Sequence, residues 1–460
     1  MNYQEFLHAK QHSSGMYGFT PHYMPDYLFD YQKYIVEYAV KKGRCAVFAD
    51  TGLGKTPIQI TVAQNIVEHT NKPVLILTPL AVAFQFIIEA EKMGLSDIAY
   101  SKDGKYNTKI VVANYERLHF FNSNDFAAVI LDESSILKNF EGATKHAITT
   151  FIKKIEYRYL FTATPSPNDF VELGTSSEAL GYMGYTDMLG KFFTNNEDTI
   201  KPQNIGTKWI LKGHAKDKFF EWVSSWSISL RKPSDIGYSD DRHILPNLIT
   251  NYHAVKNDKN MVIKGQIQMF TIVAKSLPEV REEQKLTVEK RCQHAVNIAK
   301  NYETSVYWCN RNDEGDLLEK LDKNAYQING SMSIDKKEEL LLAFAKGEIK
   351  KLITKPKITA FGLNWQHCNH TVYFPTFSFE QYYQALRRFY RFGQKRDVIA
   401  DLVYSDGQKR VLDSLIAKAK KADQLFSKLN DSIHSNYKDS KKEFNKETIL
   451  PTFLKPQNNG

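Results

Sequence analysis

Short apolar runs alternate with helical segments over much of this chain, and that alternation restricts the fold more than any other feature. In the first part of the chain the runs are CAVFA (45–49), VLILT (74–78), IVVA (110–113), AVIL (128–131) and RYLFT (158–162). Continuous apolar strands with helices between them are typical of a parallel sheet that helices cover on both faces. Apolar residues at helical spacing from Leu28 to Val40, followed by Gly43 as a stop, predict one such helix.

A second series of the same kind begins near residue 280. Its expected elements are helices near 280–300, 313–321 and 334–345, and strands 305–309, 325–329, 350–354 and 370–374. Between the two series, residues 166–245 are rich in aromatic residues, glycine and polar residues. We therefore expect an α/β protein of two parallel-sheet lobes flanked by helices, with a mainly helical insert between them.

Two further segments each admit two interpretations. The insert carries aromatic and apolar residues at roughly helical spacing, which favour a buried core over a base-stacking platform. These residues are Phe219, Phe220, Trp222, Trp226 and Ile228. The C-terminal residues 426–460 are rich in Lys and Asn and weakly periodic, so we expect a flexible, solvated tail rather than a phosphate-binding segment.

Length, charge and cysteine content limit the class of protein, and they argue against a disulfide-rich or membrane-spanning one. With 460 residues, two or three domains are expected. The net charge of +9 permits a polyanionic partner without requiring one. The four cysteines are dispersed, which predicts a reducing compartment and no disulfide framework. The N-terminus lacks an apolar signal region, and the longest apolar stretch (74–88) is interrupted, so we expect a cytoplasmic protein without a membrane span.

The segment ADTGLGKT (49–56) follows an apolar strand and opens a helix, which is the context of a phosphate-binding loop. We expect its residues to hold a nucleotide: the glycines let backbone amides curve around phosphate, Lys55 adds a charge, and the Thr56 hydroxyl suits Mg²⁺. The predicted binding residues of the loop are Thr51, Gly52, Leu53, Gly54, Lys55 and Thr56. Ala49 stands where the strict pattern has its first glycine.

An acidic pair in VILDESS (129–135) lies at the carboxyl end of an apolar strand. Ligands of open α/β sheets bind at that edge. Asp132 is therefore the candidate Mg²⁺ ligand together with Thr56, and Glu133 is the candidate base that orients and deprotonates the attacking water.

These segments together resemble helicase superfamily 2, and more closely its SNF2-like branch of nucleic-acid-dependent ATPases, over roughly residues 27–400. FDYQ (29–32) resembles the family's adenine-sensing segment, which implies that Gln32 reads the base. LTPLAVAFQF and ANYERL resemble blocks that touch the nucleic-acid backbone, and FTATP resembles the block that couples hydrolysis to nucleic acid. DESSILKNF is similar to the SNF2 form DEAHxLKN, with DESS in place of DEAH.

The resemblance continues in the second half of the chain. FGLNW is similar to the family's GGLGLNL block, which implies that Gly362 contributes to the nucleotide site. QALRRFYRFGQ is similar to its QAxxRxxRxGQ block, which implies that Gln384 helps to hold the cleft and that Arg388 and Arg391 reach the γ-phosphate. A helix through this block would place Arg388 and Arg391 on one face. We interpret the other cations in and directly after this block, Arg387, Lys395 and Arg396, as surface charge, with contact to the nucleic-acid backbone as the alternative.

The resemblance divides the chain into five regions. These are an N-terminal extension (1–24), a RecA-like ATP-binding lobe (25–165), an insert and linker (166–275), a second RecA-like lobe (276–425) and the tail (426–460). WQHCNH (365–370) offers possible zinc ligands, but no second cluster accompanies it, so packing is favoured. The match looks closest to compact helicases encoded by phages and prophages.

The function implied by the resemblance is an ATP- and Mg²⁺-dependent DNA translocase or helicase. An ATP-gated clamp or remodeller without processive motion and an RNA helicase remain alternatives. The expected partner is DNA, bound as a duplex without sequence preference, with no membrane partner. We further expect a monomer in the cytoplasm, which is the host's if a phage encodes it, with phage or host replication or recombination proteins as possible partners.

Overall fold

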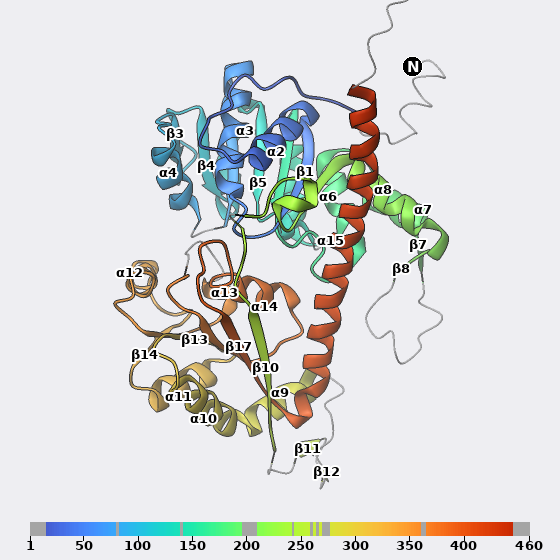
Figure 1. Cartoon of the computed structure of the whole chain (residues 1–460). Helices are drawn as coiled ribbons and strands as arrows, with labels where there is room; N and C mark the ends of the chain where they lie inside the picture. The colour runs from blue at the N-terminus through green and yellow to red at the C-terminus, as the bar shows by residue number, and fades with distance from the viewer. Residues whose placement is uncertain are drawn as a thin grey trace, which may run out of the picture.

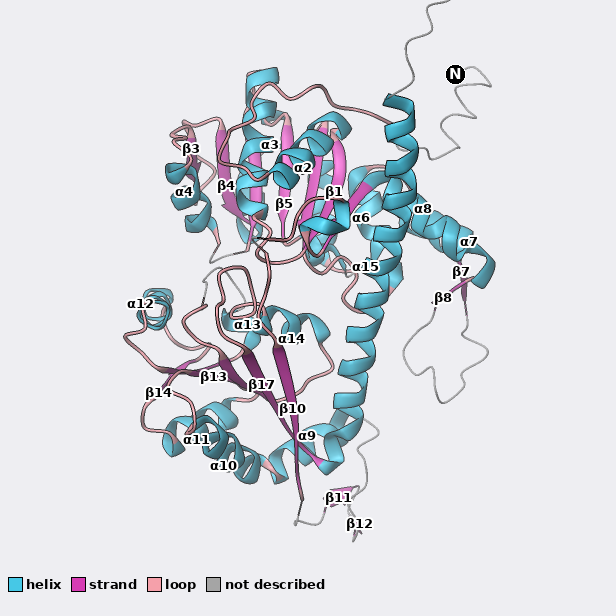
Figure 2. Ribbon diagram, in the orientation of Figure 1, coloured by secondary structure: helices cyan, strands magenta, loops and turns pink. Residues whose placement is uncertain are grey.

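The computed structural model describes residues 15–79, 82–138, 141–195, 209–241, 243–257, 261–263, 266–268, 277–359 and 365–444. Two lobes lie one above the other in Figure 1, and one long helix, α15 (Lys409–Phe444), runs beside both. Each lobe contains one large sheet with helices against it, as the strands and helices of Figure 2 show. The fold class predicted from the sequence is confirmed.

The sheet of the first lobe has seven strands in the order β3-β4-β2-β5-β6-β1-β9, all paired in parallel. They are β1 (Arg44–Ala49), β2 (Val74–Thr78), β3 (Ile98–Tyr100), β4 (Ile110–Asn114), β5 (Ala128–Asp132), β6 (Tyr157–Thr162) and β9 (Ser227–Leu230). The five apolar runs predicted as strands are therefore all strands. Successive side chains point to opposite faces, so Phe48 joins one apolar cluster and its neighbour Val47 joins another.

Helices cover both faces of this sheet. The cluster that contains Val47 includes residues of α2 (Asp30–Lys42), α3 (Lys55–Thr70) and α4 (Ala83–Lys92). The cluster that contains Phe48 includes residues of α5 (Ala143–Ile152), α6 (Leu173–Leu180) and α8 (Lys216–Trp226). Helix α2 ends as predicted, because Gly43 adopts a left-handed φ of 69° that favours glycine.

The sheet of the second lobe has six strands in the order β10-β17-β16-β13-β15-β14, again paired in parallel. They are β10 (Leu248–Val255), β13 (Ser305–Trp308), β14 (Ala325–Ile328), β15 (Lys351–Thr354), β16 (His370–Tyr373) and β17 (Val398–Ser405). The helices of this lobe are α9 (Leu277–Leu286), α10 (Val288–Ala299), α11 (Asn312–Leu321), α12 (Ile334–Ala345), α13 (Pro356–Thr359) and α14 (Phe379–Leu386).

The insert is more closely joined to the lobes than the sequence indicated. Its helices are α6, α7 (Tyr185–Phe192) and α8, and its hairpins pair β7 (Phe193–Asn195) with β8 (Trp209–Leu211) and β11 (Met261–Ile263) with β12 (Gln266–Gln268). Strand β9, however, extends the first sheet beside β1, and β10 extends the second beside β17. Each lobe therefore completes its sheet with a strand from the region between them.

The aromatic residues of the insert form core, as predicted. Phe219, Phe220, Trp222, Trp226 and Ile228 are all buried, and the first four pack in the apolar cluster of the first lobe. Among the described residues, none of the helices combines the length and apolarity that a membrane crossing requires.

The expected tail begins inside an ordered helix. Helix α15 continues through residue 426, and Leu425, Phe426 and Leu429 are buried in the apolar cluster of the first lobe. Leu412 and Leu415 of the same helix are buried in the core of the second lobe. The weak periodicity concealed this role because the apolar residues of α15 contact one lobe near its start and the other farther along. The boundary predicted at residue 426 is therefore wrong, and residues 445–460 lie outside the described part of the chain.

Candidate active site

The phosphate-binding loop connects β1 to α3. Gly52 and Gly54 have φ of 88° and 71°, which side chains other than glycine adopt only with strain. A Cβ atom on Gly54 would lie 2.2 Å from Nε2 of Gln32, and one on Gly52 would lie 2.8 Å from the backbone N of Phe392. The loop is thus packed between Gln32 of the first lobe and Phe392 of the second.

Lys55 is the first residue of α3 and points back to its own loop. Its Nζ donates hydrogen bonds to the carbonyl oxygens of Ala49, at 2.9 Å, and Asp50, at 3.3 Å. Burial lowers the pKa of Lys55, while the nearby carboxylates of Glu133 and Asp132 oppose that effect. A partly desolvated ammonium in this position would bind an anionic phosphate strongly.

Asp132 is the last residue of β5 and is held from two sides. Gln59 Nε2 donates to Oδ1 at 2.8 Å, and Thr78 Oγ1 donates to Oδ2 at 3.4 Å. Burial raises the pKa of Asp132, and the hydrogen bond from Gln59 and the charge of Lys55 counteract the shift. The carboxylate is therefore fixed in orientation at the carboxyl end of the sheet.

Glu133 has an unusual backbone conformation. Its φ is 52°, in the left-handed region that costs a residue with a side chain roughly 1–3 kcal/mol. Its Oε2 accepts a hydrogen bond of 3.3 Å from Thr162 of the FTATP segment. Burial raises the pKa of Glu133 to about 6, with Lys55 and Arg388 acting in the opposite direction. A carboxylate with this pKa can accept a proton near neutral pH.

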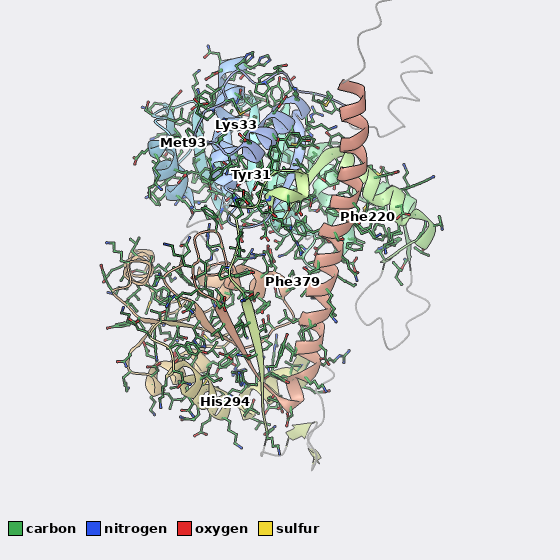
Figure 3. All side chains as sticks on the ribbon, viewed as in Figure 1. Tyr31, Lys33, Met93, Phe220, His294 and Phe379 are labelled. Carbon is green, nitrogen blue, oxygen red and sulfur yellow. The ribbon has the colours of Figure 1, made fainter. Side chains whose placement is uncertain are left out.

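A cavity of about 400 Å³ lies between the lobes and brings most of the predicted residues together. From the first lobe it is lined by Gln32, Thr51, Gly52, Gly54, Lys55, Thr56, Asp132 and Glu133. From the second lobe it is lined by Gln384, Arg388 and Arg391, together with Arg387, Gln366 and Phe392. Leu53 is buried, and Gly362 lies outside the described residues. Figure 3 shows Phe379, where α14 begins, on the side of the second lobe that faces the first.

Gln32 lies in the first turn of α2 with both ends of its amide engaged. Its Oε1 accepts from the backbone N of Phe29 at 2.9 Å, and its Nε2 donates to the carbonyl oxygen of Leu53 at 3.1 Å. Tyr31 donates to the same carbonyl at 3.1 Å. These bonds join the start of α2 to the phosphate-binding loop. A nucleotide bound at the loop could place its base beside Gln32.

Arg388 and Arg391 both reach the cavity, but not from a helix face. Helix α14 ends at Leu386, so both arginines lie in the turns that follow it, and the predicted helical placement is wrong. The backbone N of Trp365 donates to the carbonyl oxygen of Arg388 at 3.0 Å and helps to hold this segment. Burial lowers the pKa of each arginine to about 10, and the charge of Glu133 partly offsets this for Arg388.

Arg387 is not the surface charge that the sequence indicated. Its side chain is 14% exposed, and its NH2 lies 2.5 Å from Oδ2 of Asp50 in the phosphate-binding loop. Tyr383 donates to the other carboxylate oxygen of Asp50. Sequence reasoning missed the roles of Asp50, Tyr383 and Arg387 because none of the three is a specified residue of the motif patterns. The other two cations, Lys395 and Arg396, are exposed as predicted.

Two of the possible zinc ligands of WQHCNH, His370 and Cys368, have other partners. His370 is buried, with Ser305 Oγ 2.8 Å from its Nδ1 and Asp401 Oδ2 2.8 Å from its Nε2. Cys368 Sγ donates to the carbonyl oxygen of His370. The described residues contain no group of three His, Cys, Asp or Glu side chains arranged for a metal ion.

The chemistry of the donor set fits Mg²⁺. Thr56 and Asp132 both line the cavity and offer a hydroxyl and a carboxylate, the hard oxygen ligands that Mg²⁺ prefers. Gln59 Oε1, beside Asp132, is buried and has no hydrogen-bond partner within the described part of the chain. The site therefore has oxygen donors suited to Mg²⁺ with its bound water.

Two family models match this chain. The DEAD/DEAH box helicase model matches residues 29–173, and the helicase conserved C-terminal domain model matches residues 287–393. Together the two matches span more than half of the 460 residues. The chain belongs to helicase superfamily 2. The superfamily stated from the sequence motifs is confirmed, and within it the motifs of this chain resemble the SNF2-like branch.

Curated relatives match shorter stretches of this helicase. The mouse DNA annealing helicase and endonuclease ZRANB3 is 28% identical over 184 residues, which are 35% of this chain and 17% of that protein. A putative protein p41 of Acyrthosiphon pisum secondary endosymbiont phage 1 is 27% identical over 173 residues, which are 31% of this chain and 36% of that protein. The matches thus span about a sixth and about a third of these relatives.

A solved structure covers more of the chain at lower identity. The Sulfolobus solfataricus SWI2/SNF2 ATPase core, solved in complex with double-stranded DNA, is 17% identical with a TM-score of 0.42. The comparison covers 90% of this chain and 96% of that one.

Proposed function

We propose that this SNF2-like helicase is a DNA translocase that couples ATP hydrolysis to movement along duplex DNA. One observation carries the proposal: a single cavity collects Lys55 and Glu133 from the first lobe and Arg388 and Arg391 from the second. A nucleotide bound there would contact both lobes, so its hydrolysis would change how they fit together.

The residues of the first lobe bind the nucleotide and prepare the water. The backbone amides between Thr51 and Thr56 and the Lys55 ammonium bind the β- and γ-phosphates, and Gln32 reads the base. Thr56 and Asp132 would hold Mg²⁺, which supplies charge neutralisation at the phosphates. Glu133 orients the attacking water and accepts its proton, for which a pKa of about 6 is suitable.

The residues of the second lobe complete the charge stabilisation. Arg388 and Arg391 are partly desolvated cations, so each would interact strongly with negative charge that develops on the transferred phosphoryl group. We further propose that DNA lies across both lobes and is contacted mainly through its phosphates. The net charge of +9 supports this, and such binding would be independent of sequence and sensitive to salt.

A Glu133→Gln protein tests the hydrolytic assignment. It should bind ATP as the wild type does and fail to turn it over, because the amide keeps the shape of the side chain and cannot take a proton. Lys55→Ala should lose both binding and hydrolysis. A Glu133→Gln protein with normal turnover would contradict the assignment.

Parallel assays separate translocation from the alternatives. ATPase rates with double-stranded DNA, single-stranded DNA and RNA identify the activating polymer. Displacement of the third strand of a DNA triplex then tests movement, since a translocase should displace it. A clamp would hydrolyse ATP and leave the triplex intact. Activation by RNA alone would favour an RNA helicase.

A further inference from the structure

Asp50 of the phosphate-binding loop is held by two side chains of the second lobe. Arg387 NH2 lies 2.5 Å from its Oδ2, and Tyr383 donates to its Oδ1. Oδ1 also accepts from the backbone N of Thr51 at 2.6 Å. Asp50 and Arg387 have side chains 6% and 14% exposed, so the ion pair is largely removed from water. Removing one partner of such a pair would leave the other as an uncompensated buried charge, which is strongly unfavourable.

The Arg387 guanidinium is itself fixed within the second lobe. It lies 5.0 Å from the ring centroid of Tyr383 and 5.2 Å from that of Tyr390, within the range of cation–π interactions. Its NH1 donates to the carbonyl oxygen of Tyr390 at 3.3 Å. Two rings and a carbonyl of the second lobe therefore help to orient the cation toward Asp50.

The Asp50–Arg387 ion pair lies next in sequence to the groups proposed to act on the phosphates. Arg387 directly precedes Arg388, and its partner Tyr390 directly precedes Arg391. Asp50 belongs to the loop that curves around the phosphates, where a carboxylate without a cation would repel an anionic ligand. The contact thus has two consequences: it fixes the turn that carries both arginines, and it neutralises a negative charge beside the phosphates.

We propose that Arg387 and Tyr383 are positioning residues that grip Asp50 and so align Arg388 and Arg391 with the phosphates when the lobes close. The inference rests on the proposed function, since it assigns a role within the same ATP site. It assigns Arg387 no contact with nucleotide.

A double-mutant cycle tests the grip. Arg387→Gln leaves the Asp50 carboxylate without its cation and the turn without its anchor, so kcat/KM for ATP should fall by about 10²-fold. Asp50→Asn should be milder, because it leaves no unneutralised carboxylate in the phosphate-binding loop. In the Asp50→Asn/Arg387→Gln protein the repulsion is gone, so its kcat/KM should exceed that of Arg387→Gln.

Further variants separate alignment from folding. Tyr383→Phe should lower kcat more than it raises KM, since it loosens the turn and leaves the charge balance intact. Arg387→Lys should have a higher kcat than Arg387→Gln, because lysine keeps the positive charge but lacks the planar guanidinium group that forms paired hydrogen bonds. Arg396→Gln, an exposed arginine of the same block, is the matched control and should behave as the wild type. Thermal melting of each variant checks that it folds.

The outcomes distinguish this inference from the proposed function. If the fold-changes in kcat/KM of Asp50→Asn and Arg387→Gln simply multiply in the double variant, the two residues do not act together. That result would refute this inference even though the wild type still hydrolyses ATP. An Arg387→Gln protein with unchanged kcat and KM would do the same. A wild-type chain without DNA-stimulated ATPase activity would instead refute the proposed function itself.

Discussion

Ser135 and Glu380 are joined by a hydrogen bond of 3.0 Å that crosses the cleft, from Ser135 Oγ to Glu380 Oε1. Ser135 is the fourth residue of DESS, and Glu380 belongs to the first turn of α14. Lys138 donates to the other carboxylate oxygen of Glu380. The segment that carries Asp132 and Glu133 is therefore connected directly to the helix that precedes the arginines.

Ser135→Ala should weaken this connection without removing the nucleotide site. A hydrogen bond to a charged group contributes roughly 1.5–3 kcal/mol, so a loss of about tenfold in kcat is expected with ATP affinity retained. Steady-state ATPase kinetics and equilibrium ATP binding provide the measurement. Glu380→Gln is the companion variant, because it can still accept from Ser135 and loses only the charge opposite Lys138. An Ser135→Ala protein that cannot bind ATP would argue for a local folding role instead.

Arg388→Ala and Arg391→Ala should each reduce turnover far more than DNA affinity. Both side chains line the nucleotide cavity, so we expect them to act on hydrolysis rather than on DNA binding. An arginine finger typically raises the rate by about 10³–10⁵-fold. Single-turnover hydrolysis and DNA binding at a fixed salt concentration give the comparison. Arg396→Ala serves as the exposed control. Equal losses of DNA affinity and turnover would indicate that this basic block contacts the nucleic acid instead.

Phe426→Ala should destabilise the protein through α15. Phe426 is 4% exposed in the apolar cluster of the first lobe, and the Arg231 guanidinium lies 4.6 Å from its ring centroid. Truncating a buried phenylalanine costs roughly 3–5 kcal/mol. Because α15 packs on both lobes, we expect unfolding in urea to separate into two transitions. The neighbouring exposed residue supplies the control, Ser427→Ala, which should keep the wild-type profile. A single transition with unchanged midpoint for Phe426→Ala would show that the helix contributes little.

The stability of the second lobe should depend on pH through Asp401. Burial opposes its charge, but hydrogen bonds from His370, His253 and Asn251 outweigh burial and lower the pKa of Asp401 to about 2. Since an ordinary aspartate has a pKa of about 3.9, the stabilisation is complete above about pH 4 and is lost as the pH falls toward 2.

Asp401→Asn should therefore lower the free energy of unfolding by about 2 kcal/mol at pH 7. The gap between the wild type and this variant should close between about pH 4 and pH 2, as both become uncharged at this position. Urea denaturation over a pH series measures it, with exposed Asp413→Asn as control. A gap that stays constant down to pH 2 would show that the carboxylate charge is not what the histidines stabilise.

Much of the fold could be predicted because parallel strands carry their own signal. A strand buried on both faces is apolar along its length, as in residues 74–78, and needs no knowledge of its neighbours. The short β9 and the exposed edge strand β10 lack that signal, since β10 is mostly exposed or half-buried. Their roles follow from pairing with β1 and β17, which is a long-range property.

The local chemistry of the candidate site is likewise contained in short segments. A glycine loop between a strand and a helix curves because Gly52 and Gly54 accept positive φ, and Asp132 lies at a strand end because the apolar run stops there. Neither inference requires a distant partner. Which residues face them across the cavity was inferred from resemblance, and the turn that carries Arg388 and Arg391 was mistaken for helix.

Only the tertiary structure separated Arg387 from its exposed neighbour Arg396. Both are arginines in one basic block, and their local sequence contains no difference that distinguishes a buried cation from a solvated one. Burial of Arg387 is decided by Asp50, which lies 337 positions earlier in the chain. A charge leaves water only where a partner and hydrogen bonds compensate, and that compensation exists only once the two lobes are packed together.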